Sequence, residues 1–105
     1  MTYENVLSAL ADPTRRSIFE ALGTNPKTVR QLAEGQPVSR PAVSQHLKVL
    51  RDAKLVNVTP QGNRRLYSIR HEGLKELRDY VESFWTEILD AYGVEIAKRL
   101  KNQDR

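Results

Sequence analysis

The sequence predicts a single, mainly α-helical domain in which four helices are followed by a small β-hairpin and a long last helix. Three observations support this fold class. Apolar residues recur at helical spacing through the first fifty residues, the period changes to two near residues 56–69, and a helical pattern without proline fills residues 73–100. The chain has 105 residues, which suffices for one ordinary domain but not for two.

The first two helices are predicted on either side of an Asp-Pro pair. The apolar stripe of the first, over about residues 2–11, comprises Tyr3, Val6, Leu7 and Leu10. Asp12 is a favourable N-cap for the second helix, and Pro13 suits its first position because the missing N–H would be unpaired there anyway. The buried stripe of the second helix comprises Ile18, Phe19 and Leu22.

The third and fourth helices form a helix-turn-helix pattern. A short helix is predicted from an N-cap at Thr28 to about Glu34, and "GQP" ends it. The fourth helix, over residues 39–53, begins with Ser39 as its cap. Its inward face comprises Val43, Leu47 and Leu50.

A β-hairpin follows the fourth helix directly, over residues 57–69. Val56 and Val58 alternate with polar residues, and Tyr67 and Ile69 alternate on the return strand. The turn material "PQGN" places the tip of the hairpin near residues 61–63. A helix-turn-helix followed by a hairpin that carries arginines is a winged helix-turn-helix.

Three stretches of the sequence resemble the ArsR family of small bacterial repressors. They are "LADPTRRSIFEAL" (10–22), "QLAEGQPVSRPAVSQHLKVLRDAKLV" (31–56) and "GNRRLYSI" (62–69), in the order found in that family. The version "SRPAVSQHLKVL", with a tryptophan in the last helix, looks most similar to the cysteine-free branch that includes SdpR-type autorepressors. The resemblance implies a homodimeric repressor that binds double-stranded DNA at a palindromic operator.

The charge distribution agrees with a partner that is a polyanion. Between Gln36 and Arg70 the chain has seven basic residues and one acid, Asp52, for a net charge of +6, whereas the whole chain carries +4. A basic middle between near-neutral flanks is typical of a nucleic-acid-binding surface. A solvated charged face would show the same composition.

The exposed side of the fourth helix is the predicted DNA-reading element. Arg40 can form a bidentate pair with guanine and Gln45 with adenine, while Ser44 can donate to or accept from either. Lys48 and Arg51 are expected at phosphates, which position a protein without specifying sequence. The expected recognition-helix set is Ser39, Arg40, Pro41, Ser44, Gln45, His46 and Lys48. The alternative is that these are merely solvent-facing polar residues.

Arg64 and Arg65 lie just beyond the hairpin tip and are expected to contact the DNA backbone or a narrow minor groove. Successive strand residues point to opposite sides, so the two arginines are not expected to bind equally. The alternative is two turn arginines that remain in water. His46 is expected to be half-buried beside the groove. A catalytic pair of Ser44 and His46 is excluded because residues two apart on a helix do not face each other, so we expect no enzyme activity.

The last helix carries two apolar stripes, and a domain of this size can cover one of them. Together with the first helix, it is expected to build a dimer interface, as the resemblance implies. The alternative is that all these residues fill the protomer's own core. The expected interface set is Val6, Leu7, Leu10, Phe84, Trp85, Ile88, Leu89 and Tyr92.

We expect no cofactor and no metal. The sequence has no cysteine, which removes disulfides and thiolate ligands, and the last helix offers carboxylates without a histidine. No signal peptide or membrane span is recognisable, so a cytoplasmic location is expected. Two other functions remain open: a winged helix that binds a protein partner, and a repressor that responds to a metal or a small molecule.

Overall fold

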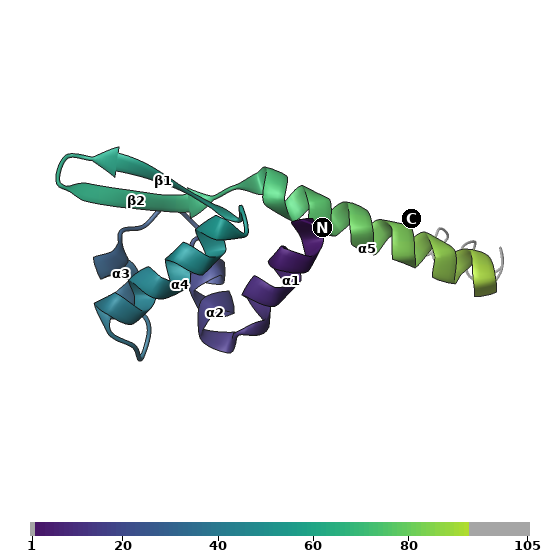
Figure 1. Ribbon diagram of the computed structural model, residues 1–105, viewed down its shortest axis with the longest axis horizontal. Coiled ribbons are helices and arrows are strands. Elements are labelled where there is room, and N and C mark those ends of the chain that lie inside the picture. Colours follow the sequence, from purple (N-terminus) through teal and green to yellow (C-terminus); the bar gives the residue numbers. More distant parts are fainter. Residues whose placement is uncertain (1, 93–105) are drawn as a thin grey trace.

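The computed structural model describes residues 2–92, and within them five helices and one two-stranded hairpin follow in the predicted order (Figure 1). The elements are α1 (Thr2–Ala11), α2 (Pro13–Ala21), α3 (Val29–Glu34), α4 (Arg40–Asp52), β1 (Val56–Gln61), β2 (Arg64–Ile69) and α5 (His71–Tyr92). The hairpin extends from one side of the α1–α4 group, and α5 runs out on the other side (Figure 1). The predicted fold class is confirmed.

Local sequence signals begin three of the helices where they were predicted. The Asp12 carboxylate accepts a hydrogen bond of 2.8 Å from the backbone N–H of Arg15 at the start of α2. Thr28 and Gln31 form a reciprocal capping box at the start of α3. The Ser39 hydroxyl accepts from the backbone N–H of Ala42, at 3.3 Å, and so caps α4. Each cap pairs a backbone donor that the helix itself leaves unpaired.

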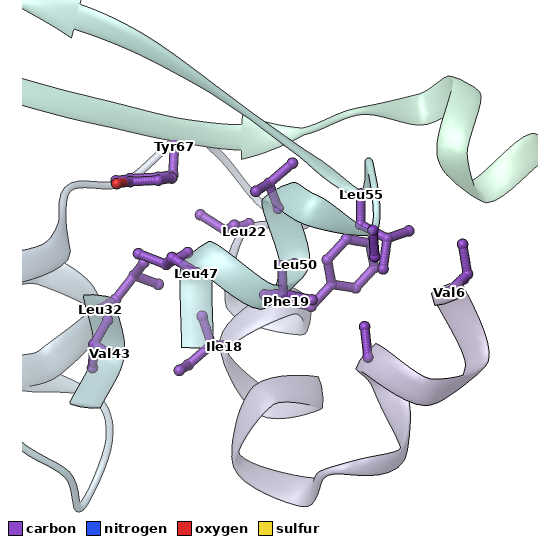
Figure 2. Close-up of a cluster of buried hydrophobic side chains, with 13 residues drawn as sticks. Val6, Ile18, Phe19, Leu22, Leu32, Val43, Leu47, Leu50, Leu55 and Tyr67 are labelled. Atoms are coloured by element: carbon purple, nitrogen blue, oxygen red, sulfur yellow. The ribbon is translucent and has the colours of Figure 1, made fainter. Parts of the chain in front are cut away.

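Apolar side chains from α1 to α4 and from the hairpin meet in one core (Figure 2). The three predicted inward residues of α4 have no exposed surface, and neither has Ile18 of α2. The larger buried members of this core are Val6, Ile18, Phe19, Leu22, Leu32, Val43, Leu47, Leu50, Leu55 and Tyr67. Full burial of one such side chain contributes about 1.5–3 kcal/mol, so the core determines how each helix is rotated.

The hairpin is attached to the body at its base. Its strands pair antiparallel, with Val56 opposite Ile69 and Gln61 opposite Arg64. Gly62, with a φ of 60°, supplies the left-handed conformation of the turn at the tip. Tyr67 is buried, and its backbone N–H and C=O both bond to Lys27 in the loop between α2 and α3, at 2.8 and 2.9 Å. The base is therefore anchored, while the tip extends beyond the core.

The chain leaves α4 through a left-handed turn at Lys54, whose φ is 61°. The N–H of Lys54 donates to the carbonyl of Arg51 and the N–H of Leu55 to that of Leu50, both at 2.9 Å. This is a Schellman motif, completed by contact between two fully buried leucines, Leu50 and Leu55. Glycine is the usual residue at this position because a left-handed conformation costs other residues about 1–2 kcal/mol.

Helix α5 begins at His71, two residues earlier than predicted, because Gly73 lies inside its first turn. A Cβ atom on Gly73 would overlap the carbonyl oxygen of Lys54, so the absent side chain is what lets α5 approach the turn after α4. Leu74 and Leu77 pack against the core, and α1 lies beside this first part of α5 (Figure 1). Residues 93–100 of the predicted last helix lie outside the described residues.

We expect Gly73→Ala to lower the free energy of unfolding by about 1–3 kcal/mol, as overpacking does, since the added methyl group must displace backbone rather than a flexible side chain. Thermal unfolding followed by circular dichroism at one protein concentration measures the loss. Gly35→Ala is the control, because the nearest atom to a Cβ there is 3.8 Å away. Equal melting temperatures for the two variants would show that α5 does not depend on this approach.

Candidate nucleic-acid interface

One side of α4 presents polar and basic side chains because the opposite side is buried in the core. Ser44, Lys48 and Arg51 are exposed, whereas Val43 and Leu47 have no exposed surface. At the start of the helix Ser39, Arg40 and Pro41 are exposed, and so is Gln45. The side chains expected at bases and phosphates are thus accessible, with the one exception of His46.

The exposed side of α4 and the hairpin border a common hollow. Ser44, Lys48 and Arg51 from α4 line it together with Arg65 from β2, and its volume is about 580 Å³. The remaining lining residues are Val29, Leu47, Asp52 and Tyr67. Asp52 is the single acid among these eight residues, so cations dominate the charge around the hollow. A helix and a hairpin therefore offer hydrogen-bond donors and positive charge to one ligand surface.

The two arginines of the hairpin are both exposed but are placed differently. Arg65 lines the hollow beside α4, whereas Arg64 lines only a second hollow, of about 530 Å³, between the hairpin tip and α3. Thr28, Arg30 and Gln31 of the α3 region also line that second hollow. This difference follows from strand alternation, the reason for which unequal binding of the two arginines was expected.

His46 is not brought together with the other residues expected on the DNA-reading face. It is half-buried, and its Nδ1 lies 3.5 Å from a guanidinium nitrogen of Arg15 on α2. Positions 46 and 48 are about 200° apart around a helix, so the side that presents Lys48 faces away from His46. His46 therefore lies against the corner between α1 and α2.

Arg15 is the residue in this region that sequence reasoning missed. Its Nε donates to the carbonyl of Ala9 at 2.6 Å, which pairs an acceptor at the carboxyl end of α1. The backbone N–H of Arg15 lowers the pKa of the Asp12 carboxyl, and the charges of Arg15 and His46 add to this. These contacts join α1, α2 and α4. The Arg15-Arg16 pair just after Asp-Pro is the only signal of them in the sequence.

A second exposed surface is apolar and lies on α5. Tyr80, Val81, Phe84 and Trp85 are between 42% and 55% exposed, and on α1 the side chain of Leu7 is 47% exposed. Such large apolar side chains grouped on one protruding helix are typical of an interaction surface.

The expected dimer set divides in the structure. Val6 has no exposed surface and belongs to the protomer's own core, while Leu10 packs partly against that core. Sequence periodicity identified the apolar stripe of α1 but not which side of it faces inward. Ile88 is half-buried. The side chains of Leu89 and Tyr92 lie outside those that the structure describes.

Two other classes of site have no counterpart in the described part of the chain. Within it, no group of three or more His, Asp or Glu side chains is arranged to hold a metal ion. No helix among the described residues is long and apolar enough to cross a membrane.

Comparison with known proteins identifies the same architecture. A helix-turn-helix domain family matches residues 10–59. The HTH-type transcriptional regulator Rv2034 of Mycobacterium tuberculosis is 54% identical over 84 residues, which cover 80% of this chain and 78% of that protein. The transcriptional repressor SdpR of Bacillus subtilis is 31% identical over 80 residues, 76% of this chain and 89% of SdpR.

Solved structures agree with the sequence relatives. The ArsR family transcriptional regulator RHA00566 superposes with a TM-score of 0.76 at 27% identity, over 82% of this chain and 94% of that one. The homodimeric winged helix-turn-helix DNA-binding domain of Mb0332 from Mycobacterium bovis has a TM-score of 0.66 at 26% identity, over 84% and 82% of the two chains. The order of the helices, the hairpin and these likenesses lead to one conclusion: the chain belongs to the ArsR family of winged helix-turn-helix transcriptional regulators.

Proposed function

We propose that this protein is a homodimeric repressor that binds a palindromic operator in double-stranded DNA, with α4 in the major groove and the hairpin as the wing. The observation that carries the proposal is the hollow bordered by Ser44, Lys48, Arg51 and Arg65, where a helix and a hairpin present cations to one surface. A B-DNA major groove is about 12 Å wide and admits one helix. The names of Rv2034 and SdpR, a regulator and a repressor, support the same function.

Base recognition is assigned to the exposed start of α4. Arg40 pairs with guanine and Gln45 with adenine through two hydrogen bonds each, and the exposed ring of Pro41 contacts a thymine methyl group. Ser44 bonds to either purine or to a phosphate. The Ser39 hydroxyl already accepts the N–H of Ala42, so its role is to hold the first turn in place.

Lys48, Arg51 and the wing arginines contact phosphates, which fixes the position of the protein on the duplex. His46 is left out of this assignment because its ring nitrogen faces Arg15. Binding to the chromosome places the protein in the cytoplasm, and no step in this function requires an enzymatic reaction or a cofactor.

The dimer is assigned to α1 and α5. Leu7, Phe84 and Trp85 are about half exposed in the protomer, and a second copy that covers them would remove this apolar area from water. A twofold axis between two α5 helices would present two α4 helices to half-sites about one turn of DNA, roughly 34 Å, apart. The homodimeric domain of Mb0332 supports this arrangement.

Footprinting of the protein on the DNA upstream of its own coding region tests the function directly. We expect a protected region with twofold sequence symmetry. A protein that gave no footprint there or at any site recovered by selection from random DNA would instead fit a winged helix that binds a protein partner. A footprint that a metal ion or a metabolite weakened would add ligand response to the function.

We expect Arg40→Ala and Gln45→Ala each to weaken operator binding by about 1–3 kcal/mol and to relax the preference at one base pair per half-site, because each removes a bidentate base contact. Fluorescence anisotropy with operators substituted one base pair at a time measures both effects. Arg78→Ala, which removes an exposed arginine from α5, is the matched control. If Gln45→Ala kept both the affinity and the base preference, α4 would not be the reading element.

We expect Arg65→Ala to weaken binding to all DNA sequences alike and to reduce the slope of log K against log salt by about 0.9, the value for one phosphate contact. Arg64→Ala should have a smaller effect, since Arg64 lies on the α3 side of the hairpin rather than beside Lys48 and Arg51. Titrations at several salt concentrations measure the slopes. A changed base preference with an unchanged slope would mean that the wing reads bases instead.

We expect Phe84→Asp to convert the protein to a monomer, because a charge would replace an aromatic side chain at the apolar surface of α5. Sedimentation velocity measures the mass. Trp85 is the only tryptophan in the chain, so a red shift of its emission would report its exposure to water at the same time. Glu76→Ala, also exposed on α5, serves as the control. A dimer that survived Phe84→Asp would place the interface elsewhere.

A further inference from the structure

A second basic hollow lies at the other end of α4, beyond the residues assigned to base recognition. Arg51, Lys54 and Arg70 line it together with Asn57, Val56 and Val58, and its volume is about 370 Å³. None of these six lining residues is acidic. The hollow thus gathers three positive charges from the end of α4, the turn after it and the segment before α5.

The backbone at this hollow carries an independent sign of use. Lys54 is the one non-glycine residue among the described residues with a positive φ. Its position in the Schellman motif is the one that glycine usually occupies, because glycine adopts this conformation without strain. A residue held in an unfavourable backbone conformation suggests that its side chain serves a purpose. Here that side chain is an exposed ammonium group at the rim of a basic hollow.

Arg51 connects the two hollows of α4. It lines the first with Ser44, Lys48 and Arg65, and the second with Lys54 and Arg70. The guanidinium of Arg70 donates to the carbonyl of Lys54 at 3.4 Å, which directs it across the turn. The basic surface therefore continues from the wing past the end of α4 without interruption by a lining carboxylate in the second hollow.

The length of α4 relates this second hollow to the edge of a DNA groove. At 1.5 Å per residue, Arg51 and Lys54 lie about 10 and 15 Å along the helix direction from Ser44. The major groove is about 12 Å wide. A helix whose first turns contact bases would thus bring its far end to the phosphates that border the groove.

We propose that Arg51, Lys54 and Arg70 bind a phosphate group of the DNA backbone, at a contact separate from those of the reading turns of α4 and of the wing. The inference rests on the proposed function. Guanidinium groups match phosphate oxygens with two parallel hydrogen bonds, and a lysine ammonium adds a point charge. Three neighbouring cations also repel one another, and an anion between them relieves that repulsion.

The test uses the full chain with Lys54→Gly. This substitution removes the cation and also places glycine where the backbone has a φ of 61°, so the variant should fold at least as well as the wild-type protein. We expect the slope of log K for operator binding against log salt to fall by about 0.9, with unchanged base preference. Lys54→Gly combined with Arg70→Ala should lower the slope by about 1.8, if the two cations act at one phosphate region.

Lys75→Ala combined with Arg78→Ala is the matched control, since it removes two exposed charges from α5 that do not line the hollow. We expect its salt slope to equal that of the wild-type protein. Phosphate ethylation interference on the same operator should reveal one phosphate per half-site whose modification weakens the wild-type protein but not Lys54→Gly. Melting temperatures of all variants are measured alongside.

The outcomes separate this inference from the proposed function. Wild-type binding to the operator with an unchanged slope and an unchanged ethylation pattern for Lys54→Gly would overturn the phosphate contact and leave the function standing. Inorganic phosphate that displaced the operator from the wild-type protein, at constant ionic strength, but not from Lys54→Gly would assign the hollow to a free phosphorylated molecule and overturn the DNA contact. A wild-type protein that bound no DNA would overturn both.

Discussion

Burial of Val43, Leu47 and Leu50 constrains everything that α4 presents to solvent. These three side chains have no exposed surface, and they lie along one side of a rigid helix. Rotation of α4 by one position, about 100°, would bring them toward water, at a cost of about 1.5–3 kcal/mol for each. The same burial turns Ser44, Lys48 and Arg51 toward the hairpin, where Arg65 lies. The DNA-facing surface is thus a consequence of the core.

The parts of the fold that sequence reasoning could predict are those determined by near neighbours. The caps at Asp12, Thr28 and Ser39 involve partners three residues away. The hairpin followed from alternation and from the turn residue Gly62. On α4, helical periodicity alone was enough to separate the exposed polar positions from the buried apolar ones, so most of the candidate site could be predicted from the sequence.

Contacts between distant segments could not be predicted in the same way. Gly73 lies inside α5 because of a backbone contact with Lys54, and nothing near Gly73 in the sequence indicates that partner. His46 contacts Arg15, 31 positions earlier, so its helical neighbours gave no sign that it lies apart from the reading face. Val6 differs from Leu7 by one position and a full change of environment, which depends on how α1 sits on the core.

The contact between Gly73 and the carbonyl of Lys54 also has a mechanical meaning. Two backbone segments meet there directly, without rotatable side-chain atoms between them that could absorb a displacement. The end of α4 and the start of α5 must therefore shift together. In a pair of protomers joined along α5, the crossing angle of the two long helices would set the separation of the two α4 helices. A molecule that altered that angle would loosen the grip on DNA from a distance.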